Sequence, residues 1–115
     1  MVGLLLFSAT GLLSCEEEEV KPNWELTSAK WTKPGLYYLE IKVKNNTGKR
    51  ATYLGIEVLL KSGSTIKKKA TYACTTSIIP NEEYTFSSSG IYLTTAEYEE
   101  LKNCSVELGH ITDLY

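Results

Sequence analysis

The most regular alternation of apolar and polar residues lies between residues 36 and 45. The odd positions from Tyr37 to Val43 are apolar or aromatic, whereas the even positions from Tyr38 to Lys44 are mostly charged. Successive side chains of a β-strand point to opposite faces of the sheet, so this pattern predicts a strand with one packed face and one face in water.

A second alternating strand is predicted over residues 51–61. It directs four aliphatic side chains inward, which are Leu54, Ile56, Val58 and Leu60. Between the two predicted strands, residues 45–48 read Asn-Asn-Thr-Gly, a composition that favours a turn. We therefore expect the two strands to pair as a hairpin at the centre of the core.

Further short segments are separated by turn-forming residues at intervals of about ten residues, a spacing typical of sandwiches and barrels. Additional strands are predicted over residues 24–31, 65–75, 83–86 and 105–115. Within the last strand, Gly109 is expected to mark a bulge that turns Ile111 inward. Thr94 and Glu97 have the spacing of a capping box, which predicts a short helix ending near Lys102. The expected fold is all-β: an immunoglobulin-like antiparallel β-sandwich of about seven strands with one short helix.

Composition supports one folded domain and disfavours one class of partner. The chain has 115 residues, of which 43% are hydrophobic and 23% charged, as in ordinary globular proteins. The formal net charge is -2 and the isoelectric point is about 5.4, so there is no overall positive field to attract nucleic acid. No nucleic-acid partner is expected.

The first residues have a different character from the rest. Residues 2–13 form an uncharged, almost wholly apolar run that is far shorter than the ~20 residues of a membrane-spanning helix. A run of this length is typical of the apolar part of a signal peptide. The sequence thus divides into a signal peptide at 1–14, an acidic tether at 15–23 and a β-sandwich domain at 24–115.

The apolar run ends in Leu12-Leu13-Ser14-Cys15, which resembles the lipobox of bacterial lipoproteins. The resemblance implies that diacylglycerol alkylates the Cys15 thiol, that the signal is cut before Cys15, and that two or three acyl chains then anchor the protein. The expected location is outside the cytoplasm, most readily the outer membrane or the cell surface. The run Glu16 to Glu19 is similar to surface-export signals of some lipoproteins; in other bacteria such positions govern inner-membrane retention, and a plain soluble linker is the remaining alternative.

A second resemblance covers about half of the predicted domain. An Asn-rich turn after the strand at 38–45, a strand ending at 59–63 and an Ile-Pro-Asn-Glu turn at 79–82 before Tyr84 and Phe86 resemble FxLYD-type domains. Those are small immunoglobulin-like modules of bacterial surface proteins and lipoproteins. The resemblance implies neither catalytic residues nor a cofactor.

Two cysteines remain once Cys15 is acylated. Cys74 and Cys104 form an even pair in an exported chain, and both lie near predicted strand ends. A disulfide between them is expected to stabilise the fold by roughly 3 to 4 kcal/mol, with two free thiols as the alternative. Two cysteines without further ligands at usable spacing do not predict a metal site.

Residue types that support catalysis are sparse. His110 is the only histidine, and it has no nucleophile motif or carboxylate at a recognisable spacing. The neighbouring pairs Glu82-Glu83 and Glu99-Glu100 are interpreted as solvated turn and helix residues, since a glycosidase needs two carboxyl groups facing each other across a cleft. We expect a non-catalytic protein without a cofactor; a small hydrolase using His110 is the competing class.

A binding surface is the remaining functional candidate. The predicted residues are Tyr38 and Tyr53, together with the basic run Lys67, Lys68 and Lys69. Further aromatic candidates are Tyr92, Tyr98, Trp24 and Trp31. The alternatives are that the lysines protect an edge strand and that the aromatic residues fill the core. The expected role is an envelope structural or interaction module held to the membrane through Cys15, with an envelope protein as partner or, alternatively, a glycan or envelope polymer.

Overall fold

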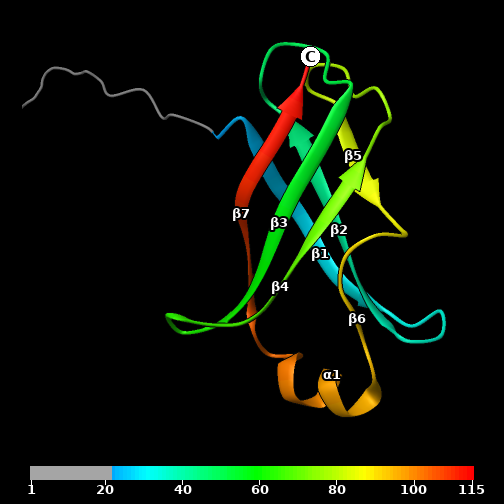
Figure 1. Cartoon of the computed structure of the whole chain (residues 1–115), viewed down its shortest axis with the longest axis vertical. Helices are drawn as coiled ribbons and strands as arrows, with labels where there is room; N and C mark the ends of the chain where they lie inside the picture. The colour runs from blue at the N-terminus through cyan, green and yellow to red at the C-terminus, as the bar shows by residue number, and fades with distance from the viewer. Residues whose placement is uncertain (1–21) are drawn as a thin grey trace, which may run out of the picture.

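The computed structural model describes residues 22–115, which form two antiparallel sheets packed face to face (Figure 1). The elements in chain order are β1 (Trp24–Thr32), β2 (Tyr37–Asn45), β3 (Tyr53–Ser62), β4 (Thr65–Cys74), β5 (Glu83–Phe86), β6 (Tyr92–Leu93), α1 (Thr95–Leu101) and β7 (Ser105–Leu114). The predicted all-β sandwich with one short helix is confirmed, and only the two-residue strand β6 was not predicted.

Each sheet is built around one central strand. In the first sheet β2 lies between β1 and β5 and also pairs with β6; in the second, β3 lies between β4 and β7. An immunoglobulin sandwich likewise pairs its second strand with the first and fifth strands, and in the variable type its third strand has a neighbour on both sides. The connectivity therefore agrees with the expected immunoglobulin-like arrangement.

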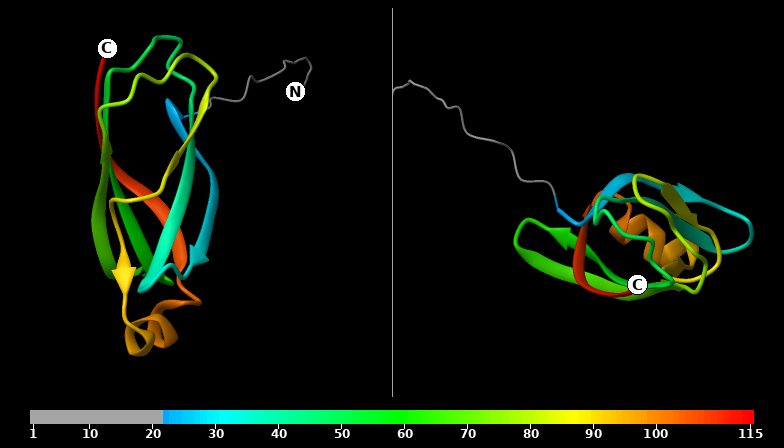
Figure 2. Two further views of the ribbon diagram at one scale, coloured as in Figure 1. Left: turned by 90° about the vertical axis from the view of Figure 1, so that its right-hand side faces the viewer. Right: turned by 90° about the horizontal axis from the view of Figure 1, so that it is seen from above.

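The predicted hairpin between the second and third strands is wrong. β2 and β3 belong to different sheets, and the segment between them crosses from one sheet to the other (Figure 2). Both strands carry aliphatic side chains toward the same core, so packing them face to face buries more apolar surface than pairing them edge to edge. Alternation identified both strands correctly but contained no information on which strands share hydrogen bonds.

The core lies between the inner faces of the two sheets. Its fully buried members come from β1 to β6 and from the loops: Trp24, Tyr38, Leu39, Ile41, Val43, Ala51, Leu54, Ile56, Val58, Leu60, Tyr72, Ile78, Phe86, Ile91 and Leu93. From β7, the partly buried Val106, Leu108 and Ile111 pack against them. The four inward residues predicted on β3 are fully buried. At roughly 1.5–3 kcal/mol for each buried large apolar side chain, this core supplies the main driving force for folding.

Tyr38 departs from the predicted pattern. Alternation placed it on the wet face of β2, yet only 2% of its surface is exposed. The chain between β5 and β6 runs along β2 and covers it: the Tyr38 hydroxyl donates to the carbonyl of Ser89 at 2.7 Å, and its ring lies 4.7 Å from that of Tyr92. The pKa of Tyr38 is raised to about 12, and burial contributes more to this rise than the neighbouring side chains do.

The two finer predictions for the C-terminal part are confirmed. Ile56 pairs with Ile111 and Val58 with Leu108, so Glu57 faces the two residues of a bulge at positions 109 and 110. Ile111 packs against the core as expected. At α1, the Thr94 hydroxyl accepts a hydrogen bond from the Glu97 amide while the Glu97 carboxylate accepts one from the Thr94 amide, as a capping box requires.

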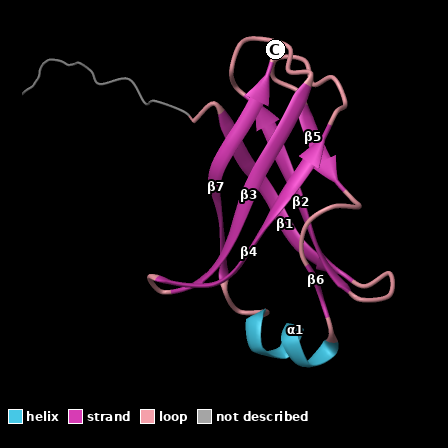
Figure 3. Ribbon diagram, viewed as in Figure 1, coloured by secondary structure: helices cyan, strands magenta, loops and turns pink. Residues whose placement is uncertain are grey.

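The molecule has two different ends (Figures 1 and 3). The chain enters the domain at Pro22, at the end that also holds the loops at 46–52 and 75–82 and the final residue; we call this the entry end. The opposite end carries α1 and the turns at 33–36 and 63–64, and we call it the helix end. No helix within residues 22–115 is long and apolar enough to cross a bilayer.

Candidate functional site

The predicted acylation site, Cys15, lies outside the described residues, as do the predicted signal peptide and the acidic run. The structure does show where the chain leading from Cys15 joins the domain. The amide of Asn46 donates to the carbonyl of Asn23 at 2.8 Å, and its side-chain Nδ2 donates to the Pro22 carbonyl at 3.2 Å. The start of the domain is therefore held against the loop that follows β2.

Asn45, the last residue of β2, organises this end from within. It is fully buried, and its Nδ2 donates to the carbonyls of Lys49 (2.8 Å) and Ile78 (2.9 Å). Its Oδ1 accepts from the amide (2.9 Å) and the hydroxyl (2.6 Å) of Thr47. Both donors and both acceptor positions of the Asn45 side-chain amide are used. This buried side chain therefore joins the loop at 46–52 to the loop at 75–82.

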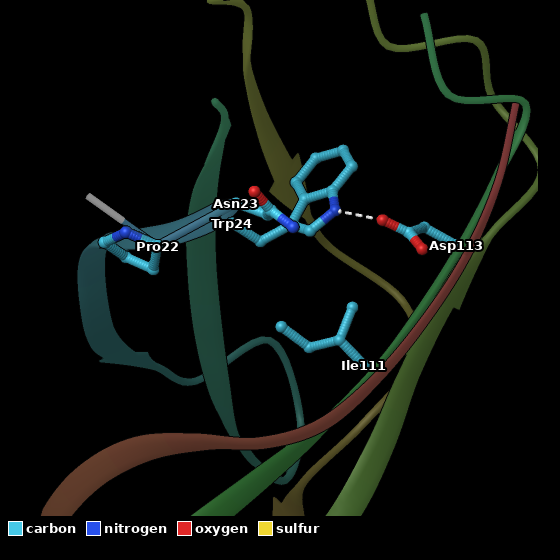
Figure 4. Close-up of a pocket in the computed structure, with 5 residues that line it drawn as sticks. All are labelled: Pro22, Asn23, Trp24, Ile111 and Asp113. Carbon is cyan, nitrogen blue, oxygen red and sulfur yellow. Dashed lines mark hydrogen bonds between the residues drawn. The ribbon is translucent and has the colours of Figure 1, made fainter. Parts of the chain in front are cut away.

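A small pocket opens beside the entry point (Figure 4). It has a volume of about 170 Å³ and is lined by Pro22, Asn23, Trp24, Ile111 and Asp113. The indole Nε1 of Trp24 donates to Oδ2 of Asp113 at 2.7 Å, so this carboxylate is already engaged. Pockets that enclose small organic ligands usually measure ~300 Å³ or more, and this one is too small for such a ligand.

The same carboxylate connects the pocket to the end of the chain. The hydroxyl of Tyr115 also donates to Asp113, and this hydrogen bond raises the pKa of Tyr115. The ammonium group of Lys49 lies 5.4 Å from the centroid of the Tyr115 ring. Asp113 therefore serves to hold two aromatic side chains at the entry end.

An aromatic cluster occupies the helix end. The rings of Tyr37 and Tyr98 stack with centroids 3.8 Å apart, and Trp31 meets Tyr98 edge to face at 5.4 Å. The ammonium group of Lys33 lies 5.2 Å from the centroid of Tyr37, within reach of a cation–π interaction. The three rings, which we call the aromatic cluster, are half-buried. Tyr98 and Trp31 belong to the predicted surface aromatics, whereas the alternating pattern of β2 places Tyr37 on the packed face.

The other predicted surface aromatics do not join this cluster. Tyr38 and Trp24 are buried. Tyr53 is half-buried, and its side chain lies along its own strand over Gly55. A Cβ atom at Gly55 would come within 2.9 Å of the Tyr53 hydroxyl. Tyr92 is partly exposed, and its hydroxyl donates to the Ser88 carbonyl. A platform that includes Tyr38 is therefore not present on the surface.

The basic run lies on β4, an edge strand of the second sheet. Lys67 is the extra residue of a bulge, since Leu60 pairs with Lys68 whereas the next residue of β3 pairs with Ile66. Lysines and bulges on an edge both oppose pairing with another chain. The position of the three lysines on β4 therefore agrees with the interpretation that they protect this edge from pairing with another chain.

The predicted disulfide between Cys74 and Cys104 is wrong, because both thiols are free. Cys74 pairs with Leu54 near the start of β3, whereas Ser105, which follows Cys104, pairs with Lys61 near its end. Seven residue steps along β3 separate these positions, which corresponds to about 23 Å along the strand. The Cα atoms of a disulfide are less than ~7 Å apart, so bridging would require a different fold.

The residues considered for catalysis lie on the open surface. His110 is exposed on the β7 bulge, where its Nε2 lies 3.4 Å from the Thr112 hydroxyl. Glu82 accepts a hydrogen bond from the amide of Ile79 inside a turn, and Glu99 pairs with Lys102 at 2.7 Å on α1. Within residues 22–115, no three metal-ligating side chains gather at one point.

Comparisons with known proteins do not add a relative. No protein-family model matches the chain, and neither the curated proteins nor the solved structures contain a significant match.

Proposed function

We propose that this protein is a bacterial lipoprotein whose sandwich domain acts as a non-catalytic structural or interaction module of the cell envelope. The observation that carries the proposal is the apolar run ending in Leu12-Leu13-Ser14-Cys15, directly ahead of a short acidic segment and a folded domain. A signal of this kind requires an apolar stretch, a small residue before the cleavage point and a thiolate nucleophile, and all three are present. Two or three acyl chains on one cysteine give a stable anchor.

The arrangement of the domain is compatible with such an anchor. The chain joins the domain at the entry end, where Asn46 holds Pro22 and Asn23. The aromatic cluster lies at the opposite end, away from the attachment point. A module tethered in this way presents its helix end to partners in the envelope or outside the cell.

Mass spectrometry of the N-terminus tests the anchor directly. The full chain is expressed in a diderm bacterium and its N-terminal peptide is analysed, with a Cys15→Ala variant as the negative control and Cys104→Ser as a matched cysteine control. We expect a diacylglyceryl-modified Cys15 at the N-terminus and partition into the detergent phase for the wild type and Cys104→Ser, and neither property for Cys15→Ala. An unmodified Met1, or a Cys15 without lipid, contradicts the proposal.

A glycan-binding role is the second candidate, and the aromatic cluster favours it. The rings of Tyr37 and Tyr98 are stacked, and Trp31 meets Tyr98 edge to face. Together with Lys33 beside Tyr37, they offer aromatic surface and a hydrogen-bond donor to a sugar ring. Titration of the protein with soluble peptidoglycan fragments, followed by Trp fluorescence, tests this role. Binding that Tyr98→Ala abolishes and Tyr53→Ala leaves intact supports it; an unchanged spectrum at millimolar fragment rejects it.

A further inference from the structure

Large apolar side chains are exposed at the entry end. Ile79, Leu114 and Tyr115 expose 55%, 57% and 53% of their surfaces. Lys49 and Arg50, both exposed, lie in the loop beside them. We call these five residues the entry face. Exposed apolar groups next to cationic groups are the composition of a surface that meets lipid headgroups.

The entry face is held in place by backbone hydrogen bonds. Ala51 and Ile78 exchange two hydrogen bonds of 2.9 Å, and the amide of Thr52 donates to the Leu114 carbonyl at 2.7 Å. The strip formed by Ala51 and Thr52 therefore joins the loop that carries Ile79 to the strand that carries Leu114. Since these bonds tie three segments together, the apolar side chains are exposed by the fold itself and not by a loose end.

Tyr115 has the features of an interfacial tyrosine. Its hydroxyl is bonded to Asp113 and the ammonium group of Lys49 lies over its ring, while more than half of the side chain faces solvent. Tyrosine is enriched at the membrane–water boundary because one part of the side chain is apolar and the other is polar.

The length of the chain ahead of the domain determines what can cover this face. Seven residue steps separate Cys15 from Pro22, so the connection spans at most ~25 Å even when fully extended. The ten residues of β3 alone span about 33 Å. An acyl chain on Cys15 would thus hold the entry end, and not the helix end, next to the bilayer.

We propose that the entry face rests on the headgroup region of the membrane that holds Cys15. Ile79, Leu114 and Tyr115 enter the interface, and Lys49 and Arg50 lie against lipid phosphates. The proposal rests on the lipid anchor proposed above. Its consequence is a fixed orientation, in which the aromatic cluster points away from the membrane.

Site-directed labelling of the acylated full chain tests the orientation. Acylation blocks the Cys15 thiol, and Cys74→Ser and Cys104→Ser remove the other two, so a single nitroxide is attached at Ile79→Cys. Leu36→Cys is the matched control, because Leu36 is 50% exposed and lies at the helix end. The protein is reconstituted into vesicles of phosphatidylethanolamine and phosphatidylglycerol, and collisions with a water-soluble nickel complex are measured.

We expect a several-fold lower collision rate for the label at position 79 than for the label at position 36. Charge reversal by Lys49→Glu with Arg50→Glu is expected to remove most of this difference. A label at Arg50→Cys provides a second position if the first variant folds poorly. Equal collision rates at both ends in protein that floats with the vesicles, or shielding of position 36 instead, overturn the docking while the anchor stands. Protein that does not float with the vesicles overturns the anchor, and the docking falls with it.

Discussion

The hydroxyl of Tyr72 on β4 donates a 2.6 Å hydrogen bond to the carbonyl of Leu39 on β2, and so joins the two sheets through the core. The same oxygen accepts a hydrogen bond from the amide of Ile91 at 3.2 Å. The ring of Tyr72 is completely buried and meets Phe86 edge to face. One side chain therefore satisfies two buried backbone groups while it fills the space between the sheets.

Tyr72→Phe is expected to lower the free energy of unfolding by about 3 kcal/mol, because it leaves the carbonyl of Leu39 and the amide of Ile91 without partners. Tyr92→Phe is the matched control, since its hydroxyl bonds to Ser88 at the surface. Urea unfolding should show a change of about 0.5 kcal/mol or less for the control. Equal effects of the two substitutions would contradict the inter-sheet role.

Stability is expected to fall above pH 10. Burial raises the pKa of Tyr38 to about 12 and raises the pKa of Tyr72 further, whereas unfolded tyrosines ionise near pH 10. Above pH 10 the unfolded chain therefore releases protons that the folded chain retains, so the stability that is fully present below pH 10 is lost as pH rises through the folded pKa. Each tyrosine contributes a slope of about 1.4 kcal/mol per pH unit.

The measurement is urea unfolding between pH 9 and pH 12 for the wild type and Tyr38→Phe. The free energy of unfolding of the variant should decline less steeply with pH, by about 1.4 kcal/mol per pH unit, because one of the two tyrosines is missing. Parallel curves for the two proteins would show that Tyr38 does not ionise differently in the folded and unfolded states.

Asn45→Ala is expected to cost about 3 kcal/mol, because the carbonyls of Lys49 and Ile78 lose a buried donor. Asn45→Asp should not restore stability, since a carboxylate cannot donate to these carbonyls. Asn46→Ala is the neighbouring control, because Nδ2 of Asn46 bonds to Pro22 and Glu25 nearer the surface. This substitution is expected to lower the free energy of unfolding by about 1 kcal/mol. Thermal and urea unfolding compare the three variants, and full rescue by Asn45→Asp would refute the donor role.

Gly90→Ala is expected to destabilise the domain by about 3 kcal/mol or more. Gly90 has φ of +120°, and a Cβ atom there would lie 2.1 Å from the ring of Tyr72. Gly35→Ala is the control, because a Cβ atom at Gly35 meets nothing within 4 Å. A calorimetric scan that finds the two variants equally stable would show that the 87–91 segment does not pack on Tyr72 in this way.

Reducing agent is expected to leave the melting temperature unchanged, because Cys74 and Cys104 are not bridged. Thiol titration of the denatured, unreduced Cys15→Ala variant should count two free thiols per chain. A count of zero together with a lower melting temperature in reductant would reinstate the disulfide. Cys15→Ala serves here to remove the third thiol from the count.

Local patterns predicted most of the elements. Alternation located β2 and β3, and the capping-box spacing located α1, since both depend on residues close together in the sequence. The strand β6 was missed because two residues are too few for a periodic pattern. Its pairing with β2 places Leu93 opposite Tyr37 and Tyr92 opposite Tyr38.

The candidate site was predictable only in part. Trp31 and Tyr98 were named as surface aromatics, but their meeting with Tyr37 joins residues from β1, β2 and α1 that are far apart in the chain. The entry face has no sequence signal at all. Ile79 belongs to a predicted turn and Leu114 to the last predicted strand, and only the tertiary structure shows that both side chains are exposed next to each other's segments.

By itself, the sequence determined the all-β class, the positions of all strands except β6, the cap of α1 and the bulge at Gly109. Each of these depends on backbone preferences and on side-chain periods within a few residues. The tertiary structure alone decided that β2 and β3 face each other across the core, that Tyr38 is buried, and that Cys74 and Cys104 lie at opposite ends of a sheet. These outcomes depend on which surfaces, far apart in the sequence, pack against each other. The hydrophobic effect is non-directional and depends on the total apolar area buried by all strands, so no local sequence pattern specifies these contacts.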